Sequence, residues 1–305
     1  MNGQNYPKNL PVNKMAIHKI LVTGSNGQLG WELAQAAANF PKFEFVFVDR
    51  TAMDLSKPAE LEAVINFFAP NVIINTAAYT AVDKAEADKE QAHLVNTSAV
   101  RELARIAKEK NIVFITYSTD YVFSGTATSP YLTDTAIHPV NSYGESKAAG
   151  ELAALKENDN AIIIRTSWVF SSHGNNFVKT MIRLMKEKES LKIVGDQKGR
   201  PTYAKDLALA TIQMILAINN GKKIKGIYHY ANSGETTWFG FAQKIKELTG
   251  LDCNLESITT DQFPTPAPRP LYSVLDTQKL EKELSIQIPN WEIALQECIH
   301  QINLA

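Results

Sequence analysis

The chain has 305 residues, 45% of them hydrophobic and 21% charged, which is typical of a globular protein with one large or two smaller domains. Its formal net charge is -1 and neither half is conspicuously basic, which argues against nucleic acid or a membrane surface as a partner and favours a small-molecule ligand. The two cysteines, Cys253 and Cys298, lie far apart without CxxC spacing, which argues against a disulfide framework or a zinc site and is compatible with a reducing compartment.

The first fifteen residues are rich in Asn, Pro and Lys and lack the apolar core of a signal peptide. We expect residues 1–15 to be a flexible leader, with Met15 as an alternative beginning. No apolar stretch approaches the length of a membrane span. These features predict a cytoplasmic protein.

From Ile17 onwards, short β-branched or aromatic segments alternate with longer helical patterns, which is typical of a parallel sheet covered by helices on both sides. The predicted strands are mostly apolar, as expected for strands buried on both faces, and span residues 19–23, 43–48, 72–75, 112–116 and 161–165. Helices are predicted between them at residues 29–39, 58–68, 88–110 and 142–156. These elements predict a Rossmann-type α/β fold, a doubly wound parallel sheet that binds a dinucleotide, over residues 16–170.

The pattern becomes less regular beyond residue 166. Helices are predicted at residues 176–187, 204–218, 237–248 and near the C-terminus, with strands at residues 191–194 and 227–230. The proline-rich segment 263–270 is predicted to be an extended loop, because proline lacks the backbone donor that helices and central strands require. We expect residues 171–305 to form a smaller α/β portion that mainly binds substrate, with about 196–235 returning to the large sheet.

A glycine-rich loop follows the first predicted strand. Gly24, Gly27 and Gly30 have the spacing GxxGxxG between that strand and the first predicted helix. Gly24 and Gly27 permit a tight turn and close approach of backbone amides to a pyrophosphate, and Gly30 lets the helix pack against the strand. A lone glycine pattern often marks a plain turn, but this position directly after the first strand predicts a dinucleotide site.

The second predicted strand is followed by Asp49 and Arg50, nearly 20 residues past the last glycine. A carboxylate at this position holds the ribose hydroxyls of NAD, whereas a guanidinium group can pair with the extra phosphate of NADP. The alternative for Arg50 is that it simply points to solvent. We expect NADPH as the cofactor, with NADH also accepted, and we expect Asp54 and Leu55 to contact the adenine.

The predicted helix at residues 142–156 carries Tyr143 and Lys147 one turn apart on the same face. The ammonium group can stabilise a phenolate, so that a tyrosine whose pKa is near 10 in water exchanges protons near neutrality. A Tyr–Lys pair of this spacing is common on solvated helix faces, but here the upstream segment Ser118-Thr119-Asp120-Tyr121 supplies a hydroxyl beside it. Such a set suits reduction of a carbonyl group by a nicotinamide.

Six blocks of the sequence have further specific patterns. They are GQLGWEL at 27–33, NTAAYTAVDKAE at 75–86, YSTDYVF at 117–123, RTSWVF at 165–170, GNNF at 174–177 and DQKGRPT at 196–202. In this order they resemble the extended short-chain dehydrogenase/reductase superfamily and, within it, the dTDP-4-dehydrorhamnose reductase family. The resemblance covers almost the whole chain after Ile17.

The resemblance implies that Thr119, Tyr143 and Lys147 are the catalytic set. Together with the glycine loop and the end of the second strand, it predicts a set of cofactor contacts: Gly24, Asn26, Gly27, Gln28, Leu29, Asp49, Arg50, Asp54, Leu55, Ala77, Ala78, Tyr79, Tyr117, Tyr143 and Lys147. It also implies substrate contacts from Thr119, Asp120 and Trp168, with Asn176 in the nearby loop 174–177.

Other side chains suit a sugar nucleotide by their chemistry. Trp168 offers a flat apolar face for a sugar ring, and its alternative is an ordinary buried tryptophan. Arg200 and Arg269 are candidates for the substrate diphosphate, since a guanidinium fork fits phosphate oxygens, although either can be only a surface charge. Arg269 lies between prolines in the predicted loop, where ligand-contacting residues tend to occur.

The activity that the resemblance implies is reduction of the 4-keto group of dTDP-4-dehydro-L-rhamnose to dTDP-L-rhamnose, so the expected partner is a dTDP-sugar. Two alternatives stay open: another sugar-nucleotide enzyme of the superfamily, an epimerase or dehydratase, and a non-catalytic NADP-binding regulatory subunit. Dehydratases of this superfamily have Asp-Glu after the threonine, whereas Asp120-Tyr121 follows Thr119 here, which favours simple reduction. The complete set of Thr119, Tyr143 and Lys147 argues against the regulatory subunit. The nucleotide on the sugar and the oligomeric state, a homodimer included, stay open.

No metal site is predicted. The six histidines are scattered without HxxxH or mixed Cys/His/Asp spacing: His18, His93, His138, His173, His229 and His300. Some members of the family are described as binding Mg²⁺ between subunits through glutamates, and Glu32 matches one such position. Lys205 stands where another acidic ligand is expected, which argues against a magnesium-bridged dimer and leaves Mg²⁺ open.

Overall fold

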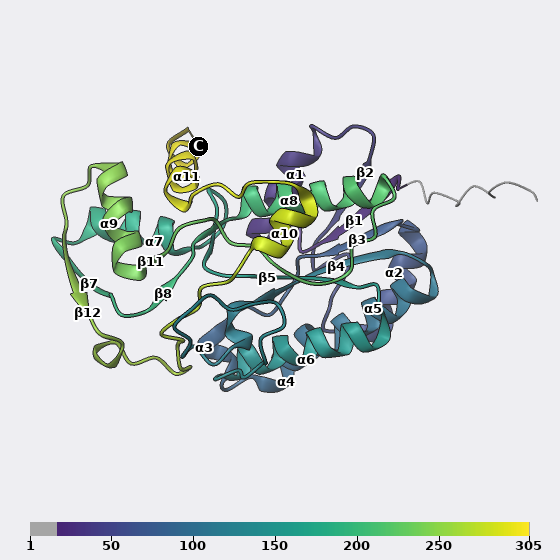
Figure 1. Ribbon diagram of the computed structural model, residues 1–305, viewed down its shortest axis with the longest axis horizontal. Helices are drawn as coiled ribbons and strands as arrows, with labels where there is room; N and C mark the ends of the chain where they lie inside the picture. Colours follow the sequence, from purple (N-terminus) through teal and green to yellow (C-terminus); the bar gives the residue numbers. More distant parts are fainter. Residues whose placement is uncertain (1–16, 305) are drawn as a thin grey trace, which may run out of the picture.

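The centre of the protein is a six-stranded parallel sheet with strand order β10-β5-β4-β3-β1-β2 (Figure 1). The computed structural model describes residues 17–304, so the predicted leader at residues 1–15 lies outside the described residues. The strands of the sheet are β1 (Lys19–Thr23), β2 (Glu44–Val48), β3 (Val72–Asn75), β4 (Val113–Thr119), β5 (Ile162–Thr166) and β10 (Gly226–His229). The predicted parallel sheet is therefore confirmed.

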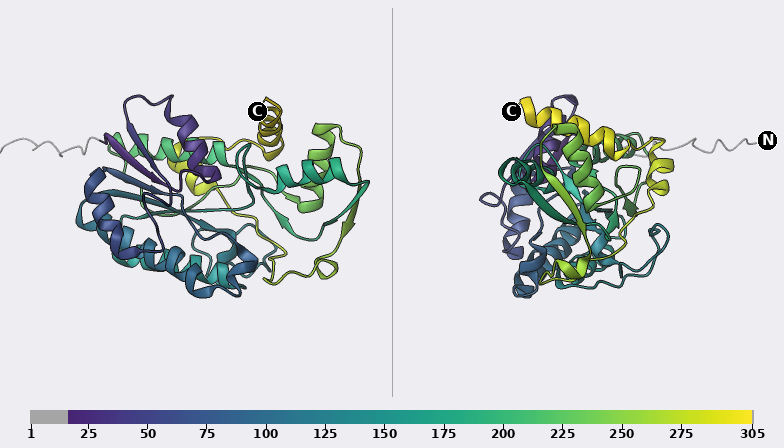
Figure 2. Two further views of the ribbon diagram at one scale, coloured as in Figure 1. Left: turned by 180° about the vertical axis from the view of Figure 1, so that it is seen from behind. Right: turned by 90° about the vertical axis from the view of Figure 1, so that its left-hand side faces the viewer.

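Helices cover both faces of this sheet (Figures 1 and 2). One face is covered by α1 (Gln28–Ala37), α8 (Ala204–Asn219) and α10 (Gln278–Leu284), the other by α2 (Leu61–Phe68), α5 (Ala99–Glu109) and α6 (Ser142–Glu157). Successive strand residues point to opposite faces, so Ile20 and Val22 join the core under α1 and α8, whereas Leu21 joins the core under α2 and α5. Burial on both faces explains why the strands are apolar throughout.

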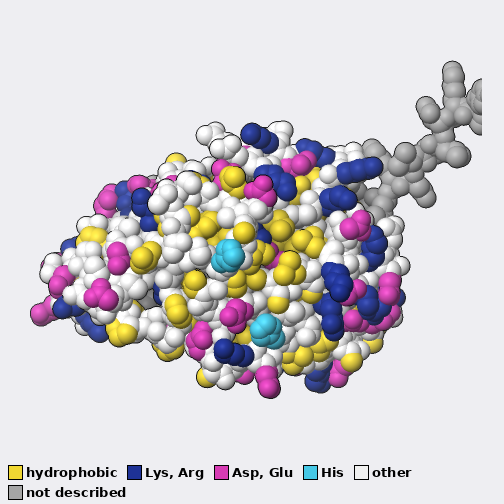
Figure 3. Space-filling model, turned by 60° about the horizontal axis from the view of Figure 1, so that its bottom comes forward, with side chains coloured by type: hydrophobic (Ala, Val, Ile, Leu, Met, Phe, Trp, Pro, Cys, Tyr) yellow, Lys and Arg dark blue, Asp and Glu magenta, His cyan; other side chains and the backbone are white. Residues whose placement is uncertain are grey.

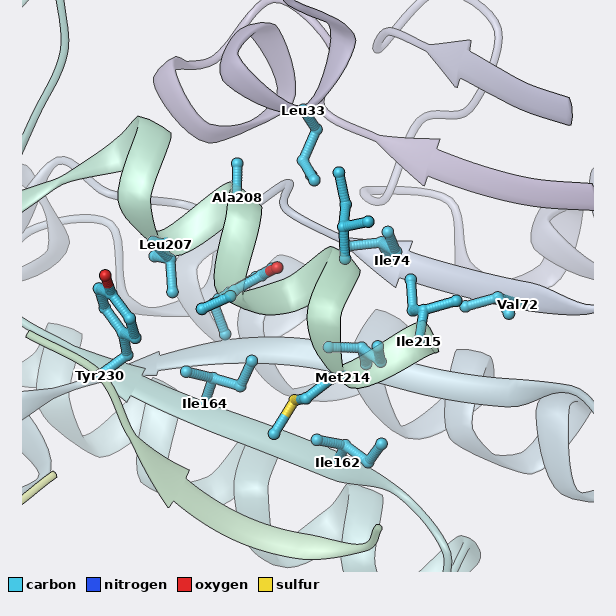
Figure 4. Packing of buried hydrophobic residues seen from close by; sticks show 14 of the residues in the cluster. Leu33, Val72, Ile74, Ile162, Ile164, Leu207, Ala208, Met214, Ile215 and Tyr230 are labelled. Atoms are coloured by element: carbon cyan, nitrogen blue, oxygen red, sulfur yellow. The ribbon is translucent and has the colours of Figure 1, made fainter. Parts of the chain in front are cut away.

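Figure 4 shows the core between the sheet and α8. Leu33 of α1 and Leu207, Met214 and Ile215 of α8 lie against side chains of two strands of the sheet, Val72 and Ile74 of β3 and Ile162 and Ile164 of β5. These side chains are almost fully buried, and burying one of this size stabilises a fold by about 1.5–3 kcal/mol. The long helix α8 is thus part of the layer that supports the sheet, although it comes late in the chain.

The remainder of the chain has its own hydrophobic core between α7 (Phe177–Glu187), α9 (Trp238–Thr249) and α11 (Trp291–Leu304). Three two-stranded sheets accompany these helices: β7 (Ser190–Val194) with β12 (Asn254–Ile258), β8 (Lys198–Gly199) with β11 (Thr236–Thr237), and β6 (Val169–Phe170) with β9 (Thr202–Tyr203). Residues 263–270 form the predicted loop. Most of these short strands were not predicted, because two residues carry no periodicity and β12 is largely exposed.

The predicted long helix at residues 88–110 is interrupted. It consists of α4 (Lys89–His93), a π-helical turn (Leu94–Ser98) and α5. The turn directs the Asn96 amide into the protein, where its oxygen accepts from the Tyr79 backbone N–H at 2.9 Å and its Nδ2 donates to Ser146 Oγ of α6 at 3.0 Å. A Cβ atom on Gly150 of α6 would overlap the carbonyl oxygen of Asn96, so only glycine lets the two segments approach this closely. The interruption therefore connects α6 to the loop that follows β3.

The surface carries charges of both signs. On the face shown in Figure 3, acidic and basic side chains are interspersed towards the edges, and hydrophobic side chains gather near the middle. Within residues 17–304, no helix combines the length and the apolar character needed to cross a lipid bilayer.

Candidate active site

A cleft of about 900 Å³ opens at the carboxyl ends of β1 and β3. The strand order changes direction between these two strands, and ligands of open α/β sheets bind at such a point. Most of the predicted cofactor residues line the cleft: Gly24, Asn26, Gly27, Gln28, Leu29, Arg50, Asp54, Leu55, Ala77, Ala78, Tyr79, Tyr117, Tyr143 and Lys147. Asp49 is not among its lining residues, and neither are the predicted substrate residues Thr119, Asp120, Trp168, Asn176, Arg200 and Arg269.

The glycine loop has the geometry that close packing requires. Gly24 has a φ of 70°, which favours glycine, and a Cβ atom there would lie 2.8 Å from the backbone nitrogen of Ala77. A Cβ atom on Gly30 would overlap the carbonyl oxygen of Gly24, so α1 can start directly against the loop only with glycine at this position. The N-terminus of α1, at Gln28, therefore faces the cleft with free backbone N–H groups, which suits a pyrophosphate.

The two residues after β2 have different roles. The carboxylate of Asp49 accepts hydrogen bonds from the backbone N–H groups of Thr51 at 2.9 Å and Ala52 at 3.2 Å, and these bonds hold the pKa of Asp49 below its usual value. Its other oxygen lies 3.4 Å from Nδ2 of Asn26 in the glycine loop. Arg50 lines the cleft, with Nε 3.3 Å from Oδ1 of Asp54. In this structure Asp49 holds the turn that follows β2, whereas the Arg50 side chain lines the cleft.

Two of the three predicted catalytic residues, Tyr143 and Lys147, line the cleft, and the third, Thr119, is hydrogen-bonded to Tyr143. β4 continues to Thr119, beyond the predicted end at residue 116, and this extension brings Thr119 to the start of α6. α6 begins at Ser142, where the side chain of Asn141 accepts from the Gly144 N–H at 2.8 Å and Glu86 accepts from the Ser142 N–H at 2.8 Å. These two bonds satisfy amides of the first helical turn and so orient the turn that carries Tyr143.

Tyr143 is held as a neutral phenol. Burial raises its pKa above the usual value, and a hydrogen bond with the Thr119 side chain lowers it by a smaller amount. This direction is opposite to the predicted effect of Lys147, because the Lys147 ammonium donates instead to the carbonyl oxygen of Tyr117 at 2.6 Å. A protonated phenol at neutral pH is the form that can give a proton to a substrate oxygen.

Lys147 is itself buried, and burial lowers its pKa to about 8 while the negative charge of Glu151 acts in the opposite direction. Glu151 lies one turn further along α6 and forms an ion pair with the fully buried Arg165 of β5, with Oε2 2.6 Å from Nη2. Sequence reasoning missed both residues. Glu151 carried no signal, since a charged residue in a helix is normally solvated, and Arg165 stood at the end of a predicted strand with nothing to indicate a buried partner.

Asp120 has an unused acceptor. Its Oδ1 accepts from Thr119 Oγ1 at 2.9 Å, whereas its Oδ2 is buried and has no hydrogen-bond partner among the described residues. Burial raises the pKa of Asp120 to about 6. Because an unpaired buried carboxylate oxygen is costly, this atom is well suited to accept a hydroxyl hydrogen from a ligand.

Trp168 has a strained backbone and an aromatic partner. Its φ is 49°, which is unusual for a bulky residue and is found mostly at functional positions. Its ring stacks on Trp238 at 3.7 Å between centroids, and Gly199 leaves room for its edge. Its chain neighbours Thr166 and Val169 both line the cleft. Trp168 thus lies beside the cleft, and Trp238 is a contact that the sequence alone did not indicate.

Three predicted substrate residues are engaged with protein groups in this structure. Arg269 pairs with Asp83 of α3 (Val82–Ala85) at 2.7 Å and donates to the hydroxyl of Tyr121 at 3.1 Å. Arg200 donates to the carbonyl oxygen of Leu275 at 3.0 Å. Asn176 caps α7 and donates to Oε1 of Gln28 at 3.0 Å. Their predicted roles remain predictions, and a substrate contact from either arginine requires it to exchange or share these partners.

The position considered for magnesium has a different environment. Glu32 is buried, accepts a hydrogen bond from Ser171 Oγ at 2.6 Å, and has a pKa raised by burial. Lys205 pairs with Glu297 close by. The part of the chain that the structure describes contains no group of three His, Cys, Asp or Glu side chains arranged to bind a metal ion.

Comparison with known proteins gives matches over nearly the whole chain. Residues 18–304 match the family model described as RmlD substrate binding domain. The chain is 40% identical over 296 residues to the dTDP-4-dehydrorhamnose reductase of Burkholderia thailandensis, a match that covers 93% of this chain and 99% of the relative.

Two similar solved structures extend the comparison to three dimensions. A dTDP-4-dehydrorhamnose reductase from Clostridium acetobutylicum has a TM-score of 0.88 and 38% identity, and the match covers 93% of this chain and 99% of that one. A dTDP-4-dehydrorhamnose reductase from Bacillus anthracis, solved in complex with NADP, has a TM-score of 0.87 and 35% identity, with the same coverage of 93% and 99%. The likeness therefore includes a protein with a bound nicotinamide dinucleotide.

Proposed function

Because the chain belongs to the RmlD substrate binding domain family, we propose that it reduces the 4-keto group of dTDP-4-dehydro-L-rhamnose to the hydroxyl of dTDP-L-rhamnose. The observation that carries the proposal is that Tyr143 and Lys147 line one cleft together with the glycine loop, with the Thr119 side chain hydrogen-bonded to Tyr143. A dinucleotide fits this cleft, since the free amides at the start of α1 suit its pyrophosphate and Arg50 suits a phosphate at its adenosine end.

A nicotinamide bound in the cleft supplies the hydride that converts the carbonyl carbon to an alcohol carbon. Tyr143 gives its phenolic proton to the carbonyl oxygen, so that no alkoxide has to be released to water. Lys147 lines the same cleft one helical turn from Tyr143. Its ammonium donates to the Tyr117 carbonyl oxygen in this structure, so it must turn towards Tyr143 to stabilise the phenolate that proton donation leaves behind. The proton of Thr119 Oγ1 points at Asp120 in this structure, so the hydroxyl must rotate before it donates to the oxygen on which charge develops.

The substrate sugar lies between these groups and the aromatic pair of Trp168 and Trp238. Asp120 Oδ2, which is buried and makes no close hydrogen bond within the described residues although the Ser273 side chain is near enough to lower the pKa of Asp120, accepts a hydrogen bond from a sugar hydroxyl. Trp168 presents an apolar surface beside the cleft to one side of the sugar ring. The nucleotide is dTDP in this proposal, and its diphosphate is the ligand for which Arg269 and Arg200 exchange their present partners.

One experiment tests the proposed function directly. The purified protein is incubated with dTDP-4-dehydrorhamnose and either NADPH or NADH, and the sugar product and the oxidised cofactor are both measured. We expect one NADPH to be consumed for each molecule of dTDP-L-rhamnose formed. A different sugar product, formed without net oxidation of the cofactor, would indicate an epimerase or dehydratase. Cofactor binding without any product would favour a regulatory subunit.

Cofactor preference gives a first prediction. We expect Arg50→Ala to lower the ratio of kcat/KM for NADPH over NADH by roughly tenfold or more, because a charge-assisted hydrogen bond to the extra phosphate contributes about 1.5–3 kcal/mol. The guanidinium is largely exposed and pairs with Asp54 at the surface, so its removal leaves the fold intact. Arg183→Ala, which removes an exposed arginine paired with Glu187 on α7, is the matched control. An unchanged ratio in Arg50→Ala would assign the preference to another residue.

Three broader features complete the proposal. Residues 16–170 act as the dinucleotide-binding domain and residues 171–305 mainly bind the substrate, while α8 and β10 return to the large sheet.

The protein works in the cytoplasm, where its two buried free cysteines stay reduced. It forms a homodimer, which sedimentation or light scattering can test.

A further inference from the structure

The segment at residues 171–176, which we call the crossing loop, reaches from the end of β6 to the glycine loop. The ring nitrogen Nε2 of His173 lies 3.2 Å from the carbonyl oxygen of Asn26, and Nδ2 of Asn176 donates to Oε1 of Gln28 at 3.0 Å. A Cβ atom on Gly174 would come within 3.3 Å of the Gln28 side chain. These contacts join segments almost 150 residues apart in the chain. The crossing loop therefore touches the two residues that flank Gly27.

The crossing loop is also fixed to the helices on either side of it. Ser171 Oγ donates to Glu32 of α1 at 2.6 Å and accepts from the His173 N–H at 3.0 Å. Asn176 accepts from the Lys179 N–H at 3.1 Å as the N-cap of α7, and its Nδ2 also donates to the Ser171 carbonyl oxygen at 2.7 Å. The loop is thus held by both of its ends.

An aromatic contact completes the attachment. The imidazole ring of His173 stacks on Trp31 of α1 with 5.0 Å between centroids and 5° between planes. Trp31 directly follows Gly30, so the stack holds His173 against the first turn of the helix that faces the cleft. One hydrogen bond and one stacked ring therefore orient the Asn26 peptide from outside the glycine loop.

The crossing loop also forms part of the cleft wall. Gly174 and Asn175 line the cleft together with Asn26, Gly27 and Gln28. The glycine loop contains Gly24 and Gly27, residues whose backbone loses the most conformational freedom when it is ordered. Contacts that hold such a loop before a ligand arrives lower the entropy lost on binding.

From these contacts we propose that His173 and Asn176 are positioning residues for the pyrophosphate of the dinucleotide. His173 holds the backbone at Asn26 and Asn176 holds the side chain of Gln28, and together they keep the glycine loop in the arrangement that presents its amides to the phosphates. The sequence excluded His173 only as a metal ligand, and it assigned Asn176 to the substrate. This inference rests on the proposed use of a nicotinamide dinucleotide, and it assigns a cofactor role to a segment outside the dinucleotide-binding domain.

The test compares ligands that differ in the pyrophosphate. Titration calorimetry measures the dissociation constants of NADPH, of 2′-phospho-ADP-ribose, which keeps the pyrophosphate, and of adenosine 2′,5′-bisphosphate, which lacks it. The variants are His173→Ala and Asn176→Ser. Asn176→Ser removes the amide that contacts Gln28 but retains a side-chain oxygen able to cap α7. His300→Ala is the control, since His300 is exposed on α11, away from the cleft.

We expect both variants to bind NADPH and 2′-phospho-ADP-ribose roughly three- to tenfold more weakly, as for loss of one hydrogen bond, and to bind adenosine 2′,5′-bisphosphate as the wild type does. If the two residues had a purely structural role, the variants would bind all three ligands more weakly. Either that result or unchanged binding of all three ligands would overturn the proposal. The two variants act on different contacts, so if one fails to fold the other still decides the outcome. No turnover is needed, so a protein that binds in this pattern but reduces no sugar would contradict the proposed function and leave this inference standing.

Discussion

Replacing Tyr143 by phenylalanine is expected to lower turnover by at least about a hundredfold, the lower end of the contribution of general acid catalysis, with little change in dinucleotide affinity. The substitution removes the phenolic proton and keeps the ring. The ring packs edge-on against Tyr121, with 5.7 Å between centroids, and this contact does not involve the hydroxyl. The loss should therefore appear in kcat and leave the stability of the fold nearly unchanged.

Steady-state kinetics with dTDP-4-dehydrorhamnose and NADPH, together with cofactor titration, provide the measurement. Tyr228→Phe is the matched control, because Tyr228 lies on the edge strand β10 and its hydroxyl is near Glu283, far from the reacting groups. The control is expected to keep normal turnover. A Tyr143→Phe protein with a near-normal rate would remove Tyr143 from the mechanism, and a protein with lost cofactor binding would assign the residue a structural role instead.

The second large effect concerns stability and the buried ion pair beneath the site. Arg165 donates from Nε to Glu151 Oε1 at 2.8 Å and from Nη2 to Oε2 at 2.6 Å, and both side chains are almost fully buried. Its guanidinium also lies 4.9 Å from the centre of the Phe123 ring. Arg165→Met leaves the Glu151 carboxylate buried and unpaired, which costs about 3–5 kcal/mol of the free energy of unfolding.

Urea denaturation followed by circular dichroism measures this loss. The double variant Arg165→Met/Glu151→Leu removes both charges and is expected to recover much of the stability, since a buried pair is often replaced by apolar residues at little cost. The control is Arg183→Met, which breaks an exposed pair with Glu187 and should change stability by less than about 1 kcal/mol. If the single variant were as stable as the wild type, or the double variant no more stable than the single one, the pair would not have this role.

The same ion pair illustrates what a local pattern cannot indicate. Glu151 stands in α6 among Gly150 and Leu152, and nothing nearby distinguishes it from a solvated helical glutamate. It becomes a buried group only because β5 places Arg165 beneath α6. His229 of β10 joins this cluster, with Nε2 3.4 Å from Arg165 Nη1, and burial together with the guanidinium charge lowers its pKa to about 3. A histidine that looked unremarkable in the sequence thus stays neutral in the core.

Errors in the predicted elements have similar physical causes. The segment 88–110 has a helical period throughout, and its interruption at Leu94–Ser98 follows from the bonds of Asn96 to Tyr79 and Ser146. β4 runs three residues past its predicted end because pairing with β5 continues to Thr119. β12 was missed because most of its residues are exposed and only pairing with β7 keeps it extended. In each case a partner distant in sequence decided the conformation.

The sequence by itself determined the parallel sheet, the glycine loop and the helix that carries Tyr143 and Lys147, because these depend on apolar periodicity, on glycine spacing and on residues one helical turn apart. Only the tertiary structure decided that Thr119 meets Tyr143, that Trp168 stacks on Trp238, and that Asn176 reaches Gln28 rather than standing free for the substrate. Such pairs lie on segments that the order of the strands brings together. Neither segment has a periodicity or a residue spacing that reports such a contact, because the contact depends on the path of the whole chain.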